Sequence, residues 1–124
     1  MDTRSKILTL DAALRLPQPL TVVTGYFDVL RADHVRDLRQ ARATAPERPL
    51  LAVVLPGEDA LLDQRARAEM LAALRMVDYV VPAAGSGLEL LQAALPSSQW
   101  VRLEAADQRR SRQLMEHVRN RQAP

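Results

Sequence analysis

Three short apolar runs limit the folds that are open to this chain. They read LTVVTG at 20–25, LLAVVL at 50–55 and DYVVP at 78–82. Apolar runs rich in β-branched residues, without polar alternation, are typical of strands that are buried on both faces, as in parallel sheets. Segments with helical spacing separate the runs, and this order of strand, helix and strand predicts a parallel sheet with helices on both faces.

Helices are expected between these runs and also before the first run and after the last. The spacing of apolar residues predicts helices over 5–16, 33–45, 60–77, 88–95 and 107–122, and a weaker fourth strand over 98–104. Thr9 and Asp33 are candidate N-caps. The long helix is expected to bury the stack Leu62, Ala66, Met70, Ala73 and Leu74. Trp100 is expected to pack in the core or in an interface.

The predicted fold class is therefore α/β, a Rossmann-like doubly wound three-layer sandwich with a parallel sheet of four or five strands. A length of 124 residues fits a single domain over 1–124, with a lead-in helix in 1–18 and an α/β core in 20–122. Sheets of this kind bind ligands beyond the carboxyl ends of their strands. The turn after the first strand, within VTGYFDVLRADH at 23–34, is the expected site.

Composition excludes several functions. The net charge is only +2 and aromatic residues make up 3%, which argues against nucleic acid as a partner. The absence of Cys excludes disulfides and thiolate chemistry, and His34 and His117 lie in no metal-binding pattern, so no metal site is expected. No apolar run reaches the ~20 residues of a membrane span. The N-terminus lacks the apolar core of a signal peptide, so the expected location is the cytoplasm.

TGYFDVLRADHV at 24–35 resembles the signature G-x-F-D-[LI]-[LI]-H-x-G-H of the cytidylyltransferase-like nucleotidyltransferases. The similarity is strongest to the domain that adenylylates heptose phosphate. KILTLDAAL at 6–14, RAEMLAALRMVDYVVP at 67–82 and LELLQAALP at 88–96 are similar to further segments of that family. The resemblance implies transfer of a nucleotidyl group from ATP or CTP, with Mg²⁺, to a small phosphorylated substrate, with release of pyrophosphate.

The resemblance also implies which residues form the site. His34 matches the second motif histidine, and Arg31 replaces the first; both are the candidate catalytic residues. The candidate nucleotide-binding residues are Gly25, Tyr26, Phe27 and Asp28 in the loop, Arg67, Arg75 and Arg102, and Ser111, the remnant of a Ser-Thr-Thr motif. A structural role in shaping the loop is equally open for Asp28. A solvated or ion-paired helix face is equally open for Arg75, and remains an alternative for Arg67.

Several family positions are altered in this chain. Asp33 replaces the motif glycine, and VRLEAAD at 101–107 lacks the glycines of the family's nucleotide loop. A carboxylate ~4 Å from a phosphate opposes it by about 4 kcal/mol at an effective dielectric near 20. Two functions remain open: a nucleotidyltransferase with weak or lost activity, and a degenerate homologue that binds a nucleotide, a phosphate ligand or a protein. A homodimer is compatible with either function.

Overall fold

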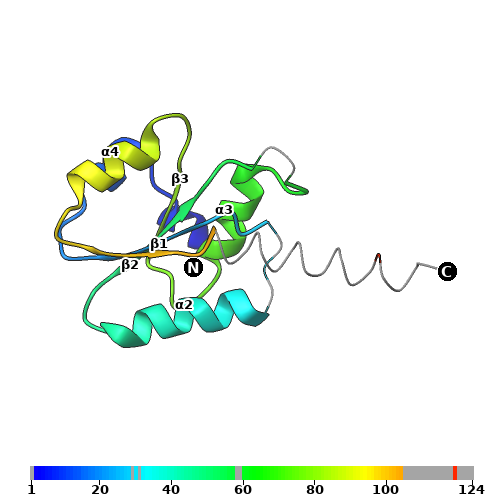
Figure 1. Cartoon of the computed structure of the whole chain (residues 1–124), viewed down its shortest axis with the longest axis horizontal. Helices are drawn as coiled ribbons and strands as arrows, with labels where there is room; N and C mark the ends of the chain where they lie inside the picture. Colours follow the sequence, from blue (N-terminus) through cyan, green and yellow to red (C-terminus); the bar gives the residue numbers. More distant parts are fainter. Residues whose placement is uncertain (1, 29, 31, 58–59, 105–118, 120–124) are drawn as a thin grey trace.

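The computed structural model describes residues 2–28, 30, 32–57, 60–104 and 119. Short helices and strands alternate along the chain (Figure 1). In chain order the elements are η1 (Thr3–Lys6), α1 (Leu10–Leu14), β1 (Thr21–Gly25), α2 (Ala32–Thr44), β2 (Leu50–Val54), α3 (Gln64–Ala72), β3 (Tyr79–Pro82), α4 (Gly87–Ala94) and β4 (Gln99–Arg102).

The four strands form one parallel sheet in the order β3-β2-β1-β4. Thr21 of β1 is level with Leu50 of β2 on one side and with Gln99 of β4 on the other. The chain first builds outward from β1 to β3 and then crosses back to place β4 on the other side of β1. The strand order therefore reverses between β1 and β4, and the carboxyl ends of these two strands border the crevice in which such folds bind ligands.

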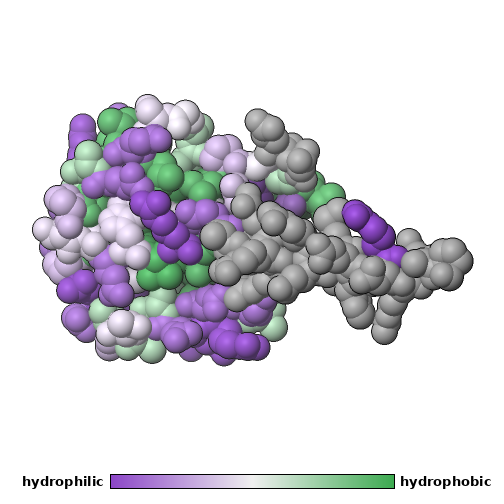
Figure 2. All heavy atoms as spheres, viewed as in Figure 1, coloured by the Kyte–Doolittle hydropathy of each residue, from purple (hydrophilic) through white to green (hydrophobic). Residues whose placement is uncertain are grey.

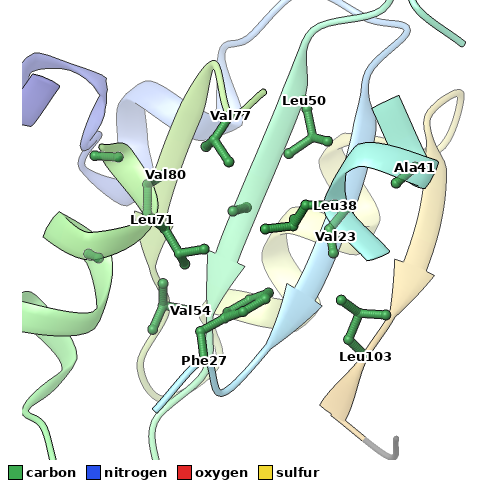
Figure 3. Close-up of a cluster of buried hydrophobic side chains, with 13 residues drawn as sticks. Val23, Phe27, Leu38, Ala41, Leu50, Val54, Leu71, Val77, Val80 and Leu103 are labelled. Atoms are coloured by element: carbon green, nitrogen blue, oxygen red, sulfur yellow. The ribbon is translucent and has the colours of Figure 1, made fainter. Parts of the chain in front are cut away.

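Helices cover both faces of the sheet, because the strand side chains alternate between two apolar clusters. Val23 and Ala52 face α2 and α3, and Val22 and Leu51 face α1 and α4. Figure 1 shows α2 and α4 on opposite sides of the sheet, and Figure 3 shows Leu38 of α2 and Leu71 of α3 directed onto its strands. The predicted α/β three-layer architecture is confirmed, with four strands in the described part of the chain.

The predicted strands are confirmed to within two residues at each end, but two helix predictions were partly wrong. The helix expected over 5–16 is interrupted, because Ile7 pairs with Val80 at the outer edge of β3 and only Leu10–Leu14 is α-helical. Thr9 caps this helix by accepting a hydrogen bond from the Ala12 N–H at 3.2 Å. The helix expected over 107–122 lies outside the described residues except at Arg119, which is helical and exposed.

The helix expected over 60–77 is shorter and presents a different face. It begins at Gln64 after the N-cap Asp63, and it ends at Ala72. Its buried residues are Arg67, Ala68, Leu71 and Ala72, not the predicted stack. Within the described residues, no helix combines the length and the apolar character that crossing a bilayer requires.

Candidate functional site

The loop after β1 has an unusual backbone conformation at Phe27. Its φ is 51°, in the left-handed region, which costs a bulky L-residue roughly 1–2 kcal/mol. The ring is fully buried in the cluster beneath α2 and α3, and Figure 3 shows it at the ends of β1 and β2. Burial of the ring therefore holds the loop in a conformation that the backbone disfavours. Strain of this kind is concentrated at functional sites.

Asp28 ties this loop to the segment that precedes α3. Its two carboxylate oxygens accept hydrogen bonds from the Leu61 N–H at 2.8 Å and the Leu62 N–H at 2.9 Å. Both acceptor atoms are thus engaged by the protein backbone. The structure gives Asp28 the loop-shaping position that the sequence left open.

Arg67 completes the same attachment from inside the protein. The side chain is only 2% exposed. Its Nη1 donates to the carbonyl oxygens of Tyr26 and Leu55, each at 2.8 Å, and its Nε donates to the carbonyl oxygen of Leu62 at 3.1 Å. Arg67 therefore joins the loops after β1 and β2 to the start of α3, and three of its donor bonds are made to the backbone.

His34 and Asp33 lie in the first turn of α2, beside the loop. His34 is 3% exposed, and its ring centroid lies 5.9 Å from that of Phe27 at an interplanar angle of 60°. The Asp33 carboxylate accepts a hydrogen bond from the His34 N–H at 3.0 Å. Asp33 was expected to cap α2, but the helix begins at Ala32 and Asp33 lies inside its first turn. The imidazole is thus packed within the protein rather than presented to solvent.

A hydrogen bond between Thr24 and Glu104 spans the crevice between β1 and β4. The Thr24 hydroxyl, 1% exposed, donates to Oε2 of Glu104 at 2.7 Å. Glu104 lies two residues after the end of β4, within the segment where the resembled family carries glycines. The sequence shows this substitution, but it does not show that β4 lies beside β1. The pairing of β4 with β1 places the carboxylate at the reversal in strand order.

The remaining predicted residues are dispersed. Arg75 is exposed in the turn before β3, at the amino edge of the sheet, so the structure does not bring it to the β1 loop. Arg102 is exposed at the carboxyl end of β4, near the crevice. Arg31 and Ser111 lie outside the described residues. Gly25 ends β1, and its carbonyl oxygen accepts from the Leu55 N–H at 2.9 Å.

The described residues at this edge offer limited chemistry. They contain no group of three or more His, Cys, Asp or Glu side chains that is placed to hold a metal ion. The carboxylate of Asp33 lies at the start of α2, and that of Glu104 lies at the crevice. Among the predicted site residues, Arg102 is an exposed cation near the crevice. A negatively charged ligand meets opposing charge at this edge as well as the favourable N-terminus of α2.

Comparison with known proteins identifies no family for the chain. No protein-family model matches the sequence, and no curated protein matches it. The nucleotidyltransferase assignment therefore depends on the motif resemblance, and the fold is established by the parallel sheet and its helices.

Proposed function

We propose that this chain is a cytidylyltransferase-like nucleotidyltransferase domain that binds a nucleotide or phosphate ligand at the β1–β4 crevice and has weak or lost transfer activity. The location is supported by the reversal of strand order beside β1 and by the strained Phe27 in the adjoining loop. The motif residue Asp28 lies in this same loop, and the motif residue Gly25 ends the strand before it.

The loss of activity is supported by one observation above the others: three polar side chains of the predicted site serve the fold. Asp28 and Arg67 bind backbone groups, and His34 is buried against Phe27. Catalysis of nucleotidyl transfer requires donors aimed at the phosphate oxygens in the transition state, and loss of one such donor costs roughly 10²–10³ in rate. At the first motif histidine, Arg31 supplies a different donor, a guanidinium in place of an imidazole.

A resident magnesium site does not fit the described residues, because no three potential ligands gather there. We therefore propose that Mg²⁺ enters the site bound to the phosphates of ATP or CTP and is not held by protein side chains. The acceptor remains a small phosphorylated compound, as the resemblance implies.

The first test is titration calorimetry of the full chain with ATP and with CTP in the presence of Mg²⁺, followed by a pyrophosphate-release assay with sugar phosphates. We expect weak nucleotide binding and little or no release above the background without protein. Rapid release that His34→Ala abolishes would show an active transferase and contradict the loss of activity. Absence of binding for both nucleotides and for pyrophosphate would contradict the ligand assignment.

A charge test localises the ligand. Asp33→Asn and Glu104→Gln remove a negative charge without changing side-chain size, and Glu47→Gln removes one from an exposed turn at the amino edge. A single charge at ~4 Å is worth about 1 kcal/mol in water and about 4 kcal/mol at an effective dielectric of 20. We therefore expect each crevice variant to tighten triphosphate binding by about fivefold or more, and Glu47→Gln to leave it unchanged. Equal effects in all three variants would place the ligand elsewhere.

A further inference from the structure

The two edge strands of the sheet, β3 and β4, differ in whether a described segment pairs with their outer side. At the β3 edge, Ile7 and Leu8 run alongside the strand, and the Leu8 N–H donates to the Val80 carbonyl oxygen at 2.7 Å. At the other edge, β4 is the last strand, and no described residue pairs with its outer side. An uncovered edge offers a row of backbone donors and acceptors to a further strand.

The backbone groups that face outward at this edge can be identified. The Gln99 N–H donates to Leu20 and the Leu103 N–H donates to Thr24, so the odd-numbered residues of β4 direct their backbone groups toward β1. By the alternation of a strand, Trp100 and Arg102 direct theirs outward. Two N–H groups and two carbonyl groups of β4 thus point away from β1, and no described residue makes a backbone hydrogen bond to them.

The side chains beside this edge are partly apolar. Trp100 and Val101 are half-buried, and a groove of about 300 Å³ runs between β4 and α2, lined by Ala41, Val101 and Leu103 with a polar rim. Figure 1 has β4 in orange at the near edge of the sheet, and Figure 2, in the same view, shows apolar surface between that strand and α2. The exposed backbone and the apolar surface therefore occur together.

We propose that this edge is a homodimer interface, in which β4 pairs antiparallel with β4 of a second copy across a two-fold axis at Val101. In this register Trp100 faces Arg102 of the second copy, and Arg102 faces its Trp100. These are the residues with outward backbone groups, so each facing pair exchanges two hydrogen bonds, as an antiparallel ladder requires. Val101 then faces its own copy as a pair without backbone hydrogen bonds.

Charge and ring chemistry favour a second copy over an unrelated strand. Residues that face each other across a sheet share one face, so the Arg102 guanidinium of one copy lies next to the Trp100 indole of the other. A guanidinium over an indole face is an attractive pair, and the two-fold axis forms it twice. The strand thus complements itself, and the dimer would contain one continuous eight-stranded sheet.

Cross-linking tests the register directly, because the natural chain contains no Cys. In a pair without backbone hydrogen bonds the two Cα atoms lie about 4.5 Å apart, within reach of a disulfide. Val101→Cys is therefore expected to form a disulfide-linked dimer on mild oxidation. In Gln99→Cys the two equivalent positions are offset by four residues, about 14 Å, which is too far for a disulfide.

Gln99 is exposed whereas Val101 is half-buried, so random collisions would favour Gln99→Cys. Faster cross-linking of Val101→Cys supports the proposal, and equal or faster cross-linking of Gln99→Cys overturns it. The same chains without oxidant, and the natural chain, are followed by sedimentation equilibrium at micromolar concentrations. The natural chain is expected to be a dimer; a monomer throughout the range would overturn the proposal.

A disruptive variant completes the test. Arg102→Pro removes the outward N–H and the guanidinium that would face Trp100 of the second copy. It leaves the backbone hydrogen bonds to β1 in place, because Arg102 does not donate to β1, and an edge strand tolerates such a proline. We expect the variant to remain folded by circular dichroism and to weaken dimerisation at least tenfold. The control is Arg75→Glu, which changes an exposed arginine at the amino edge of the sheet and should leave the dimer intact. A folded Arg102→Pro variant that dimerises normally would overturn the proposal.

Discussion

Replacement of Arg67 by Met tests whether this arginine stabilises the fold or serves to bind a nucleotide. The side chain is 2% exposed and donates to the carbonyl oxygens of Tyr26, Leu55 and Leu62. Met has a similar length and no donors, so Arg67→Met leaves these three carbonyl groups without their present partner. The expected result is a large loss of folding free energy in the absence of any ligand.

The expected loss of folding free energy follows from the number of hydrogen bonds that Arg67 donates. Hydrogen bonds from a charged donor contribute roughly 1.5–3 kcal/mol each, so three at the lower figure give about 4.5 kcal/mol. Removal of a buried guanidinium also relieves its desolvation cost, which offsets part of this loss. We expect a net destabilisation of about 3 kcal/mol, which is a substantial fraction of the roughly 5–15 kcal/mol that stabilises a typical domain.

The assay is equilibrium unfolding in urea, followed by circular dichroism and by the fluorescence of Trp100, the only tryptophan. With a slope near 2 kcal/mol per molar urea, a loss of about 3 kcal/mol lowers the unfolding midpoint by about 1.5 M. The matched control is Arg75→Met, which changes an exposed arginine at the other edge and should act within about 0.5 kcal/mol. Equal midpoints for the two variants would refute a structural role for Arg67.

Three further predictions concern other described residues. Phe27→Gly should be more stable than Phe27→Ala by about 1 kcal/mol in thermal melts, because both lose the buried ring and only Gly adopts a φ of 51° without strain; the reverse order would show that the conformation is not retained. Asp78 accepts from the Leu50 N–H at 2.8 Å and pairs with Arg42. In urea unfolding, Asp78→Ala should therefore lower the free energy of unfolding by about 1 kcal/mol more than Arg42→Ala does, and equal losses would contradict this. The side-chain hydrogen bond from Arg4 holds the pKa of Asp2 below its ordinary value, so the stabilisation from Asp2 is present above that ordinary value and is lost as pH falls through the lowered pKa. Titration of the Asp2 carboxyl by NMR should show its pKa rise in Arg4→Ala, and an unchanged pKa would exclude this cause.

The parallel sheet was predictable because its information is local. Each apolar run is long enough for one strand and lacks polar alternation, so burial on both faces follows from the run itself. The order of the strands is a different matter. The placement of β4 beside β1 depends on how the crossover from β3 packs, and no short segment of the sequence encodes it.

The start of α3 shows why the helix bounds and the role of Arg67 were harder to predict. Propensity continues from residue 60, but Asp28 holds the Leu61 and Leu62 N–H groups, and Asp63 caps the helix instead. Arg67 then faces inward because three carbonyl oxygens converge there from distant segments. From the sequence alone, an arginine in a helix is expected to be exposed to solvent, and only the positions of those acceptors show that it is buried.

The distribution of charge at the β1–β4 crevice connects the fold to the proposed loss of activity. A nucleotide loop needs glycines so that its backbone N–H groups can approach the phosphates closely, and it needs little negative charge nearby. Glu104 lies in the segment 101–107, which lacks the loop glycines of the resembled family, and its carboxylate accepts a hydrogen bond from the buried Thr24 hydroxyl. That hydrogen bond stabilises the carboxylate in the crevice that a triphosphate would enter. The same contact joins β1 to the segment after β4, so under the proposed function the bond that stabilises the sheet also holds a charge that opposes phosphate binding.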